Sequence, residues 1–236
     1  MNKGKLFLVS TPIGNLEDIT YRAIRILKEV EVIAAEDTRV THKLLSFYGI
    51  KDKRVVSYRD NNERQSAKGL IKLLLKGKNI SIVSDAGMPV INDPGFSIIK
   101  EAIENDIEIR VLPGPSATLT TLVLSNFNTF FTYDGFLNPK QGKRKNELLK
   151  MNHGTHIILV TPHNIKQVLR DIDEVLPKQT KVFLGRELTK KFETHYRGSA
   201  LEILNNLDII KGEFTMALSI PKIKINKYKK GNNVSK

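Results

Sequence analysis

Residues 80–117 hold the feature that most constrains the fold, which is a pair of short apolar runs that each end in a loop of Asp, Gly, Pro and Ser. The first run reads I-S-I-V and leads into S-D-A-G-M-P-V-I-N-D-P-G, and the second reads I-R-V-L and leads into P-G-P-S-A. Runs of this kind are typical of strands buried in a parallel sheet. Because open α/β sheets bind ligands outside the carboxyl ends of their strands, the two loops predict a small-ligand site.

The same alternation of strands and helices extends over residues 1–125. Strands are expected at residues 5–11, 32–35, 54–57, 80–84 and 109–112. Helices are expected between them, including residues 41–48 and 65–76. Asp93 is predicted to cap a further helix with Pro94 in its first position, and Ser116 to cap the last one. Five strands alternating with helices predict an N-terminal α/β domain with a parallel sheet.

Residues 126–221 predict a second α/β domain. Strands are expected at residues 132–136, 156–160, 181–185, 193–197 and 214–220, and helices at 144–151, 165–175 and 201–207. The runs at 181–185 and 193–197 are too close for a helical crossover, so this sheet should be mixed. Residues 222–236 hold six Lys and no acidic residue. They predict a basic tail.

Composition excludes several classes of site. The chain has no Cys, which rules out disulfides and Cys-based chemistry. His153, His156 and His163 lack the spacing of metal ligands, so no metal site is expected and these histidines are interpreted as structural. No apolar run approaches the roughly 18 residues of a membrane span, and the run at residues 6–9 is too short for a signal peptide. A cytoplasmic protein without membrane attachment is expected.

The net charge of +13 is distributed unevenly. Residues 1–125 hold 18 Lys and Arg against 15 Asp and Glu, a net charge of +3, whereas residues 126–236 hold 20 against 10, a net charge of +10. A surplus on one half favours a polyanionic partner such as nucleic acid. The alternative is a Lys-rich composition that serves only solubility, and charge alone does not decide between them.

Three further segments carry polar groups suited to chemistry. Residues 36–39, Glu-Asp-Thr-Arg, follow a predicted strand and suit proton transfer or substrate orientation, although a plain acidic helix start is the alternative. The basic loop at 139–145 is the best local phosphate-binding candidate, against a merely solvated loop. Residues 186–192 carry both charge signs and could form an internal ion pair or a substrate contact. The T-P-I-G-N turn after the first strand is not a dinucleotide fingerprint.

Taken together, the motifs resemble those of a known family. They are L-F-L-V-S-T-P-I-G-N-L-E-D-I-T, A-A-E-D-T-R, S-D-A-G-M-P-V-I-N-D-P-G, L-P-G-P-S-A, R-E-L-T-K-K-F-E and K-G-E-F. The set resembles the bacterial methyltransferases that modify the ribose 2′-oxygen of a cytidine in 16S ribosomal RNA. That family belongs to the tetrapyrrole methylase-like (class III) superfamily of S-adenosylmethionine enzymes. The resemblance spans nearly the whole chain.

The resemblance implies two α/β domains, S-adenosyl-L-methionine as methyl donor between them, ribosomal RNA of the small subunit as partner, and a homodimer. The domains are expected at residues 1–125 and 126–221, followed by the tail at 222–236. The residues expected to bind the cofactor are Pro12, Ser84, Asp85, Ala86, Gly87, Pro113, Gly114, Ser116, Ala117 and Thr215.

For the transfer of a methyl group to a ribose hydroxyl, a base or a cation beside that hydroxyl should help. Asp37, Asp85 and Glu36 are candidate bases, and Arg39 and Lys190 candidate electrostatic stabilisers. The residues expected to bind RNA are Lys140, Lys143, Arg144, Lys145, Arg186 and Lys190. Two other functions remain open, a methyltransferase of the same fold acting on a tetrapyrrole and a basic RNA-binding protein without catalysis. The basic second half argues against the former.

Overall fold

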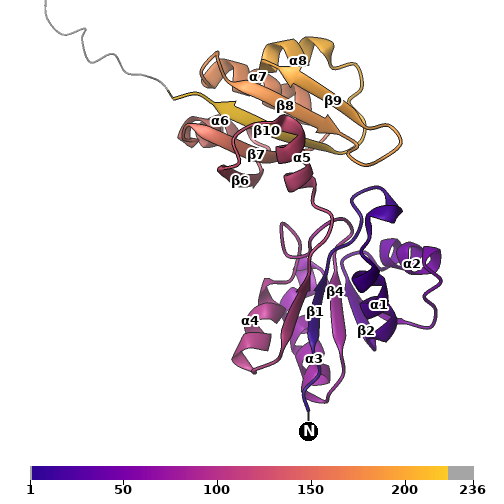
Figure 1. The fold of residues 1–236 in the computed structure, drawn as a ribbon. Coiled ribbons are helices and arrows are strands. Elements are labelled where there is room, and N and C mark those ends of the chain that lie inside the picture. The colour runs from indigo at the N-terminus through magenta and orange to yellow at the C-terminus, as the bar shows by residue number, and fades with distance from the viewer. Residues whose placement is uncertain (1, 223–236) are drawn as a thin grey trace, which may run out of the picture. The chain divides into compact units, whose positions relative to one another are not determined.

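The computed structural model describes residues 2–222, which divide into two compact units that each contain a five-stranded sheet (Figure 1). The first unit runs to Thr120 and also includes Leu188–Phe192, whereas the second holds Thr121–Glu187 and continues from Glu193. From residue 223 onward, the expected basic tail lies outside the described residues. Within residues 2–222, no helix is long and apolar enough to cross a membrane.

The first unit is built on a sheet in which every pair of neighbouring strands is parallel. The strand order is β3-β2-β4-β1-β5. The strands are β1 (Leu6–Val9), β2 (Val32–Ala35), β3 (Arg54–Ser57), β4 (Ile80–Val83) and β5 (Ile109–Leu112). The inner strands β1, β2 and β4 are buried along their whole length. Burial on both faces explains why they read as continuous apolar runs, and the predicted parallel sheet is confirmed.

Helices cover both faces of this sheet (Figure 1). Leu27 packs with Val9 on one face, and Leu74 packs with Ile82 on the other. The first face is covered by α1 (Tyr21–Glu29) and α2 (Thr38–Phe47), and the second by α3 (Glu63–Leu75) and α4 (Phe96–Glu104). The short 3-10 helices η1 (Leu16–Asp18) and η2 (Asp60–Asn62) lie in connecting loops. The unit is therefore a three-layer α/β structure.

The start of α4 differs from the prediction that Asp93 caps it. The helix begins at Phe96, after Gly95 with a φ of 153°. Glu63 reaches over from α3, and its Oε1 accepts hydrogen bonds from the backbone N–H of Gly95 at 3.1 Å and of Ser97 at 2.8 Å. A carboxylate from a neighbouring helix thus satisfies the free amides at this helix end. The prediction that Asp93 caps α4 is therefore wrong.

The second unit contains a mixed sheet, as predicted. Its strand order is β6-β7-β10-β8-β9. The strands are β6 (Phe131–Phe136), β7 (Gly154–Val160), β8 (Lys181–Arg186), β9 (Thr194–Gly198) and β10 (Phe214–Ile220). Only β6 and β7 pair in parallel, and the other neighbours are antiparallel. Strands β8 and β9 form the antiparallel pair that their short separation in sequence predicted.

The helices of the second unit are distributed unevenly over its sheet. Three of them cover one face, where Leu169 packs with Met216. They are α6 (Gln141–Lys150), α7 (Ile165–Val175) and α8 (Ala200–Asn206). On the other face Leu122 packs with Phe183. Leu122 belongs to α5 (Ala117–Ser125), the helix in which the first unit ends and the second begins.

Candidate active site

The pairing register of the first sheet brings its strand ends to one edge. Val9 at the end of β1 pairs with Val83 of β4 and with Leu112 of β5. Val83 also pairs with Ala35 of β2. The loops that follow these four strands therefore begin side by side. This is the edge at which parallel α/β sheets bind their ligands.

The loops after β1 and β4 are joined by an isolated bridge between Thr11 and Gly87. Thr11 N–H donates to the Gly87 carbonyl at 2.9 Å, and Gly87 N–H donates to the Thr11 carbonyl at 3.1 Å. The Ser84 hydroxyl donates to the same Gly87 carbonyl at 3.0 Å. Gly87 has a φ of 80°, a conformation that favours glycine. Ser84 and Gly87, two of the predicted cofactor-binding residues, thus fix the conformation of the loop. Pro12, a third, is buried beside Thr11.

The loop after β5 approaches the loop after β1 closely. A Cβ built on Gly114 would lie 2.8 Å from the Cβ of Ser10, so only glycine allows this separation. Pro113 and Gly114 are exposed. Ser116 Oγ accepts a hydrogen bond from Leu119 N–H at 3.3 Å, which places it at the start of α5 as predicted. Three small-residue loops, after β1, β4 and β5, therefore line one stretch of the sheet edge.

These three loops contain every predicted cofactor-binding residue except Ala117, the first residue of α5, and Thr215. Thr215 lies on β10 in the second unit, where it pairs with Gly185 and Leu159 and is 7% exposed. Its assignment to the cofactor stays a prediction that rests on the resemblance.

The predicted catalytic residues Asp37, Arg39 and Asp85 form one hydrogen-bonded group. Asp37 is the N-cap of α2, and its Oδ1 accepts from Arg39 N–H at 2.8 Å. The Arg39 guanidinium also donates to the Asp37 carboxylate, with Nη2 at 2.5 Å from Oδ2. The backbone N–H of Asp37 donates to Asp85 Oδ1 at 3.0 Å. Neighbouring strands thus join two motifs that lie 48 residues apart in sequence.

The carboxyl groups at this edge differ in basicity. Hydrogen bonds from Arg39 hold the pKa of Asp37 well below its ordinary value. Burial raises the pKa of Asp85, and burial together with the negative charge of Asp85 raises the pKa of Glu36. Since a carboxylate with a raised pKa is the better proton acceptor, Asp85 and Glu36 suit the role of base more than Asp37 does.

Asp93 is a member of this acidic group that the sequence analysis missed. Burial, followed by the charges of Glu36 and Asp85, raises the pKa of Asp93 to about 7. The Asp-Pro-Gly sequence obscured this role because it is also a common helix-start pattern. The signal that could have revealed it is the length of the loop between β4 and α4, since long ordered loops are usually functional. Three carboxyl groups with raised pKa therefore lie at one edge of the sheet.

The structure corrects the prediction that Arg144 contacts RNA. Arg144 lies in α6 and its side chain is 2% exposed. Its Nε and Nη2 both donate to Asp171 Oδ2 at 2.7 Å, and Nη1 donates to the carbonyls of Asn138 and Pro139. Asp171 is fully buried and also accepts from Gln141 at 3.0 Å. Such a satisfied, buried pair is structural, because moving Arg144 out to bind phosphate would take its guanidinium away from the buried Asp171 carboxylate.

The other basic residues predicted to bind RNA have different surroundings. Arg186 is 8% exposed and its Nε donates to the Lys211 carbonyl at 2.7 Å, so it takes part in the fold of the second unit, and its contact with RNA stays a prediction. Lys145 is partly buried and pairs with Glu174 at 2.7 Å. Lys140 and Lys143 are exposed around the start of α6, and their contact with RNA stays a prediction.

Lys190 lies against the loop after β1 in the first unit. A Cβ on Gly14 would collide with the Lys190 side chain. The Thr189 hydroxyl next to it accepts a hydrogen bond from Asn15 N–H at 3.1 Å. The R-E-L-T-K-K-F segment therefore serves two purposes, since Arg186 anchors β8 while Thr189 and Lys190 contact the turn after β1.

His156, one of the three histidines interpreted as structural, bridges two acceptors in the second unit. Its Nδ1 lies 2.9 Å from Asp134 Oδ2, and its Nε2 lies 3.0 Å from the Asn152 carbonyl. The hydrogen bond with Asp134 raises the pKa of His156. Across residues 2–222, no group of three or more His, Asp or Glu side chains has an arrangement that could hold a metal ion.

Solved structures of known proteins share this fold. Diphthine synthase superimposes with a TM-score of 0.70 at 16% identity, covering 92% of this chain and 90% of that one. A uroporphyrin-III C-methyltransferase from Thermus thermophilus, complexed with S-adenosyl homocysteine, gives a TM-score of 0.63 at 13% identity, covering 92% of this chain and 97% of that one. At these identities the likeness shows the fold alone.

Sequence relatives are far closer. A ribosomal RNA small subunit methyltransferase I from Mycoplasmopsis pulmonis is 47% identical over 218 residues, 92% of this chain and 98% of the relative. One from Thermotoga maritima is 42% identical over 222 residues, with the same coverage. The model of the tetrapyrrole (corrin/porphyrin) methylases matches residues 5–204. The chain therefore belongs to the tetrapyrrole (corrin/porphyrin) methylase family and, within it, to the group of the ribosomal RNA small subunit methyltransferases I.

Proposed function

We propose that this protein is an S-adenosylmethionine-dependent methyltransferase that methylates the ribose 2′-oxygen of a cytidine in small-subunit ribosomal RNA. The proposal rests on the register of the first sheet, which brings its strand ends to one edge. At that edge, loops of small residues that can hold a cofactor lie beside carboxyl groups whose pKa is raised. The group of relatives supports ribosomal RNA as the substrate. The cytidine and its 2′-oxygen come from the motif resemblance. A cytoplasmic location and a homodimer are part of the proposal.

The residues at the sheet edge fit S-adenosylmethionine. This donor carries a sulfonium cation, which the carboxylate of Asp85 nearby would favour. The loops offer exposed backbone at Ala86 and Gly114, where no large side chain stands in the way of a ligand. Ala117 opens α5, a nine-residue helix whose N-terminus favours a carboxylate such as that of the donor's amino-acid end. Bound there, the donor supplies an electrophilic methyl group.

The chain's own task in the reaction is to orient the ribose and to accept its proton. Transfer of the methyl group to the 2′-oxygen would break the bond between that carbon and the donor's sulfur, which would leave as a neutral thioether, and the hydroxyl proton would have to pass to a base of the chain. We assign that proton to Asp85 or Glu36. Their raised pKa values make them better proton acceptors than an ordinary carboxylate. The Asp85 carboxylate holds the backbone N–H of Asp37, and the Asp37 carboxylate orients Arg39, which would offer positive charge near the reacting oxygen.

Two measurements test the proposal against its alternatives. Calorimetry with S-adenosylmethionine should show binding, and a chain that binds RNA but no donor would be a binding protein instead. Mapping of 2′-O-methylation on ribosomal RNA, from cells with and without the gene, should show one cytidine that loses its methyl group. An unchanged map together with methylation of a tetrapyrrole in vitro would reassign the enzyme to that substrate.

The assignment of the base is tested by single-turnover rates at saturating donor. Asp85→Asn should slow methyl transfer by roughly 10²–10⁴-fold, the usual contribution of general base catalysis. Asp37→Asn should slow it less, because that carboxylate is held as an ion-paired cap rather than as a proton acceptor. Full rates in both variants and in Glu36→Gln would rule out proton transfer to this group.

A further inference from the structure

Helix α2 has an exposed stripe that the proposed reaction leaves without a role. Arg39, Lys43 and Phe47 are spaced four residues apart and are all exposed, so they follow one another along the helix surface. Thr41 and Leu45 are buried on the side that faces the sheet. Arg39 belongs to the candidate catalytic group, and Phe47 lies about 12 Å further along the helix axis at 1.5 Å per residue. The stripe therefore runs from the reacting groups toward the far end of the helix.

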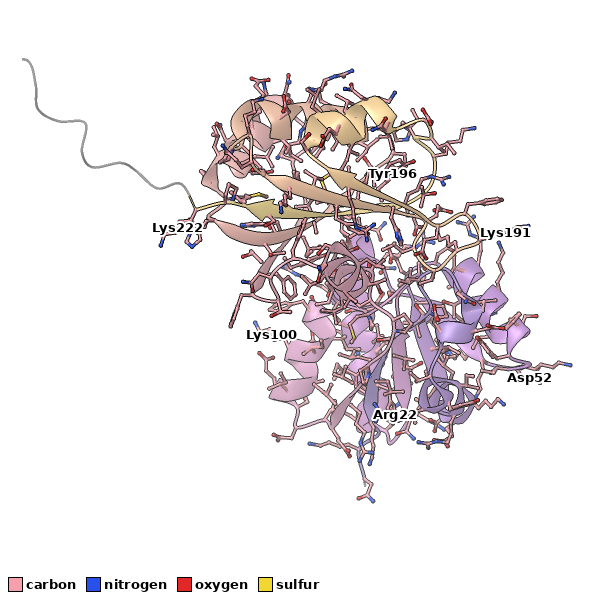
Figure 2. All side chains as sticks on the ribbon, turned by 45° about the horizontal axis from the view of Figure 1, so that its top comes forward. Arg22, Asp52, Lys100, Lys191, Tyr196 and Lys222 are labelled. Atoms are coloured by element: carbon pink, nitrogen blue, oxygen red, sulfur yellow. The ribbon has the colours of Figure 1, made fainter. Side chains whose placement is uncertain are left out.

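A pocket of about 530 Å³ opens at that far end. Phe47 lines it together with Gly14 and Leu16 from the loop after β1 and with Lys190 and Lys191 from the segment Leu188–Phe192. All of these residues belong to the first unit. Lys191 is exposed and projects from the loop between β8 and β9 (Figure 2). The pocket thus combines an aromatic ring with two cationic side chains and the single carboxylate of Glu17.

The walls of this pocket are held in place. Tyr48 packs edge-on against Phe47, with ring centroids 5.0 Å apart, and its hydroxyl donates to the Leu16 carbonyl. The hydrogen bond from Asn15 N–H to the Thr189 hydroxyl fastens the opposite wall. Phe47 nevertheless remains 61% exposed. A positioned but exposed aromatic ring beside cations is a typical surface for stacking a nucleobase.

We propose that the α2 track, defined as Lys43, Phe47, Lys190 and Lys191, binds a single-stranded segment of the RNA substrate next to the modified nucleotide. A base stacks on the Phe47 ring, and the lysines contact the flanking phosphates. This inference rests on the proposed function. Charge complementarity favours RNA over a second copy of the chain, because the chain carries a net charge of +13 and three of its lysines lie in the track.

The test uses exposed variants of the full-length protein and a fluorescein-labelled single-stranded RNA of mixed sequence. Phe47→Ala should weaken RNA binding about tenfold, the effect of losing one base–aromatic stack. Phe47→Tyr should keep the affinity, whereas Phe47→Leu should lose it because leucine has no ring face. Lys43→Ala should lower the slope of log affinity against log salt by about 0.7, since one phosphate contact is lost from a single strand.

Helix α4 offers matched controls in the same unit. Phe96 and Lys100 are also exposed and four residues apart, but they lie on a helix of the opposite sheet face. Phe96→Ala and Lys100→Ala should leave RNA affinity and its salt slope unchanged. Calorimetry with S-adenosylmethionine should give the same affinity in all variants, which would show that each is folded.

The outcomes separate this inference from the proposed function. If the wild-type protein neither binds nor methylates ribosomal RNA, the proposed function fails. If it methylates RNA and Phe47→Ala binds as tightly as Phe96→Ala, only the α2 track is wrong. If Phe47→Ala changes the molecular mass measured by light scattering, the surface is an interface between two copies of the chain, and RNA is not its occupant.

Discussion

Asp93 places an ionisable side chain in a partly buried, acidic environment, so it should make the stability of the first unit depend on pH. Its pKa is about 7 in the folded chain, against an ordinary value of 3.8. The folded state therefore holds a proton that the unfolded chain has already released between about pH 4 and pH 7. The contribution of Asp93 to the free energy of unfolding therefore falls as pH rises through that range.

Asp93→Asn removes this dependence. At pH 8 we expect the variant to be more stable than the wild type by about 1–4 kcal/mol, since each tenfold change in proton affinity is worth about 1.4 kcal/mol. At pH 4 the two should unfold alike. Thermal unfolding at both pH values measures the difference, and Asp106→Asn, an exposed position in the same unit, is the control. A stability gain that is equal at both pH values would show that Asp93 does not titrate in this range.

Arg144 gives a second prediction at the scale of a single residue. Arg144→Ala removes the guanidinium that pairs with the buried Asp171 and should destabilise the second unit by about 3–5 kcal/mol. Lys143→Ala changes an exposed neighbour and should cost less than about 0.5 kcal/mol. Denaturant unfolding measures both. Equal stability of the two variants would contradict the structural role of the Arg144–Asp171 pair.

A residue's role could be predicted from the sequence where it depends on the residue's place after a strand. It could not be predicted where it depends on a side chain that is distant in sequence. Asp37 and Asp85 are each the second residue after an apolar run, so their place at the sheet edge could be predicted. Arg144 stands among exposed lysines in sequence, and its buried contact with Asp171, 27 residues away, is not visible in the sequence pattern. Asp93 has the sequence pattern of a helix cap, but the structure shows that Glu63, from another helix, accepts the hydrogen bonds of the free amides at the start of α4.

At the scale of elements, the loop after β4 depends on one glycine conformation. Gly87→Ala forces a φ of 80° on a residue with a Cβ, at a cost of about 1–2 kcal/mol. It also places that Cβ 3.3 Å from Ile13, beside the bridge to Thr11. We expect lower stability and weaker binding of S-adenosylmethionine, measured by thermal unfolding and calorimetry.

The control for this prediction is Gly69→Ala in the middle of α3. Gly69 has open space around its Cα, and alanine is favoured over glycine in a helix by about 0.8–1 kcal/mol. This variant should gain stability and keep its affinity for the donor. If Gly87→Ala also kept full donor affinity, the loop after β4 would not hold the cofactor.

Element bounds could be predicted where apolar runs end in turn residues. The predicted ranges 32–35, 54–57, 109–112, 165–175 and 214–220 coincide with β2, β3, β5, α7 and β10. The start of α6 was placed three residues late, at Arg144 instead of Gln141. Asn138 and Glu147 fix that start through side-chain hydrogen bonds at 2.8–3.0 Å, and the apolar pattern contains no signal of these.

For the whole molecule, the parallel and mixed sheets could be predicted from strand spacing, but the order of their strands could not. Alternating strands and helices fix which residues end a strand, and they leave open which strands are neighbours. The adjacency of β2 and β4 is what joins Asp37 to Asp85. Both Asp37 and Asp85 could therefore be predicted as site residues, but the hydrogen bond between them could not.

The net charge of the whole molecule should affect its affinity for RNA. Residues 223–236 contribute five lysines and no acid, so a chain that ends at Lys222 has a formal net charge of +8 instead of +13. Counterion release makes log affinity fall with log salt by about 0.7 for each single-strand phosphate neutralised. Deletion of 223–236 should therefore weaken RNA binding at low salt and flatten its salt dependence, while calorimetry shows an unchanged affinity for S-adenosylmethionine. The same slope in both chains would mean that these lysines do not contact RNA, and that the cations of residues 2–222 bind it alone.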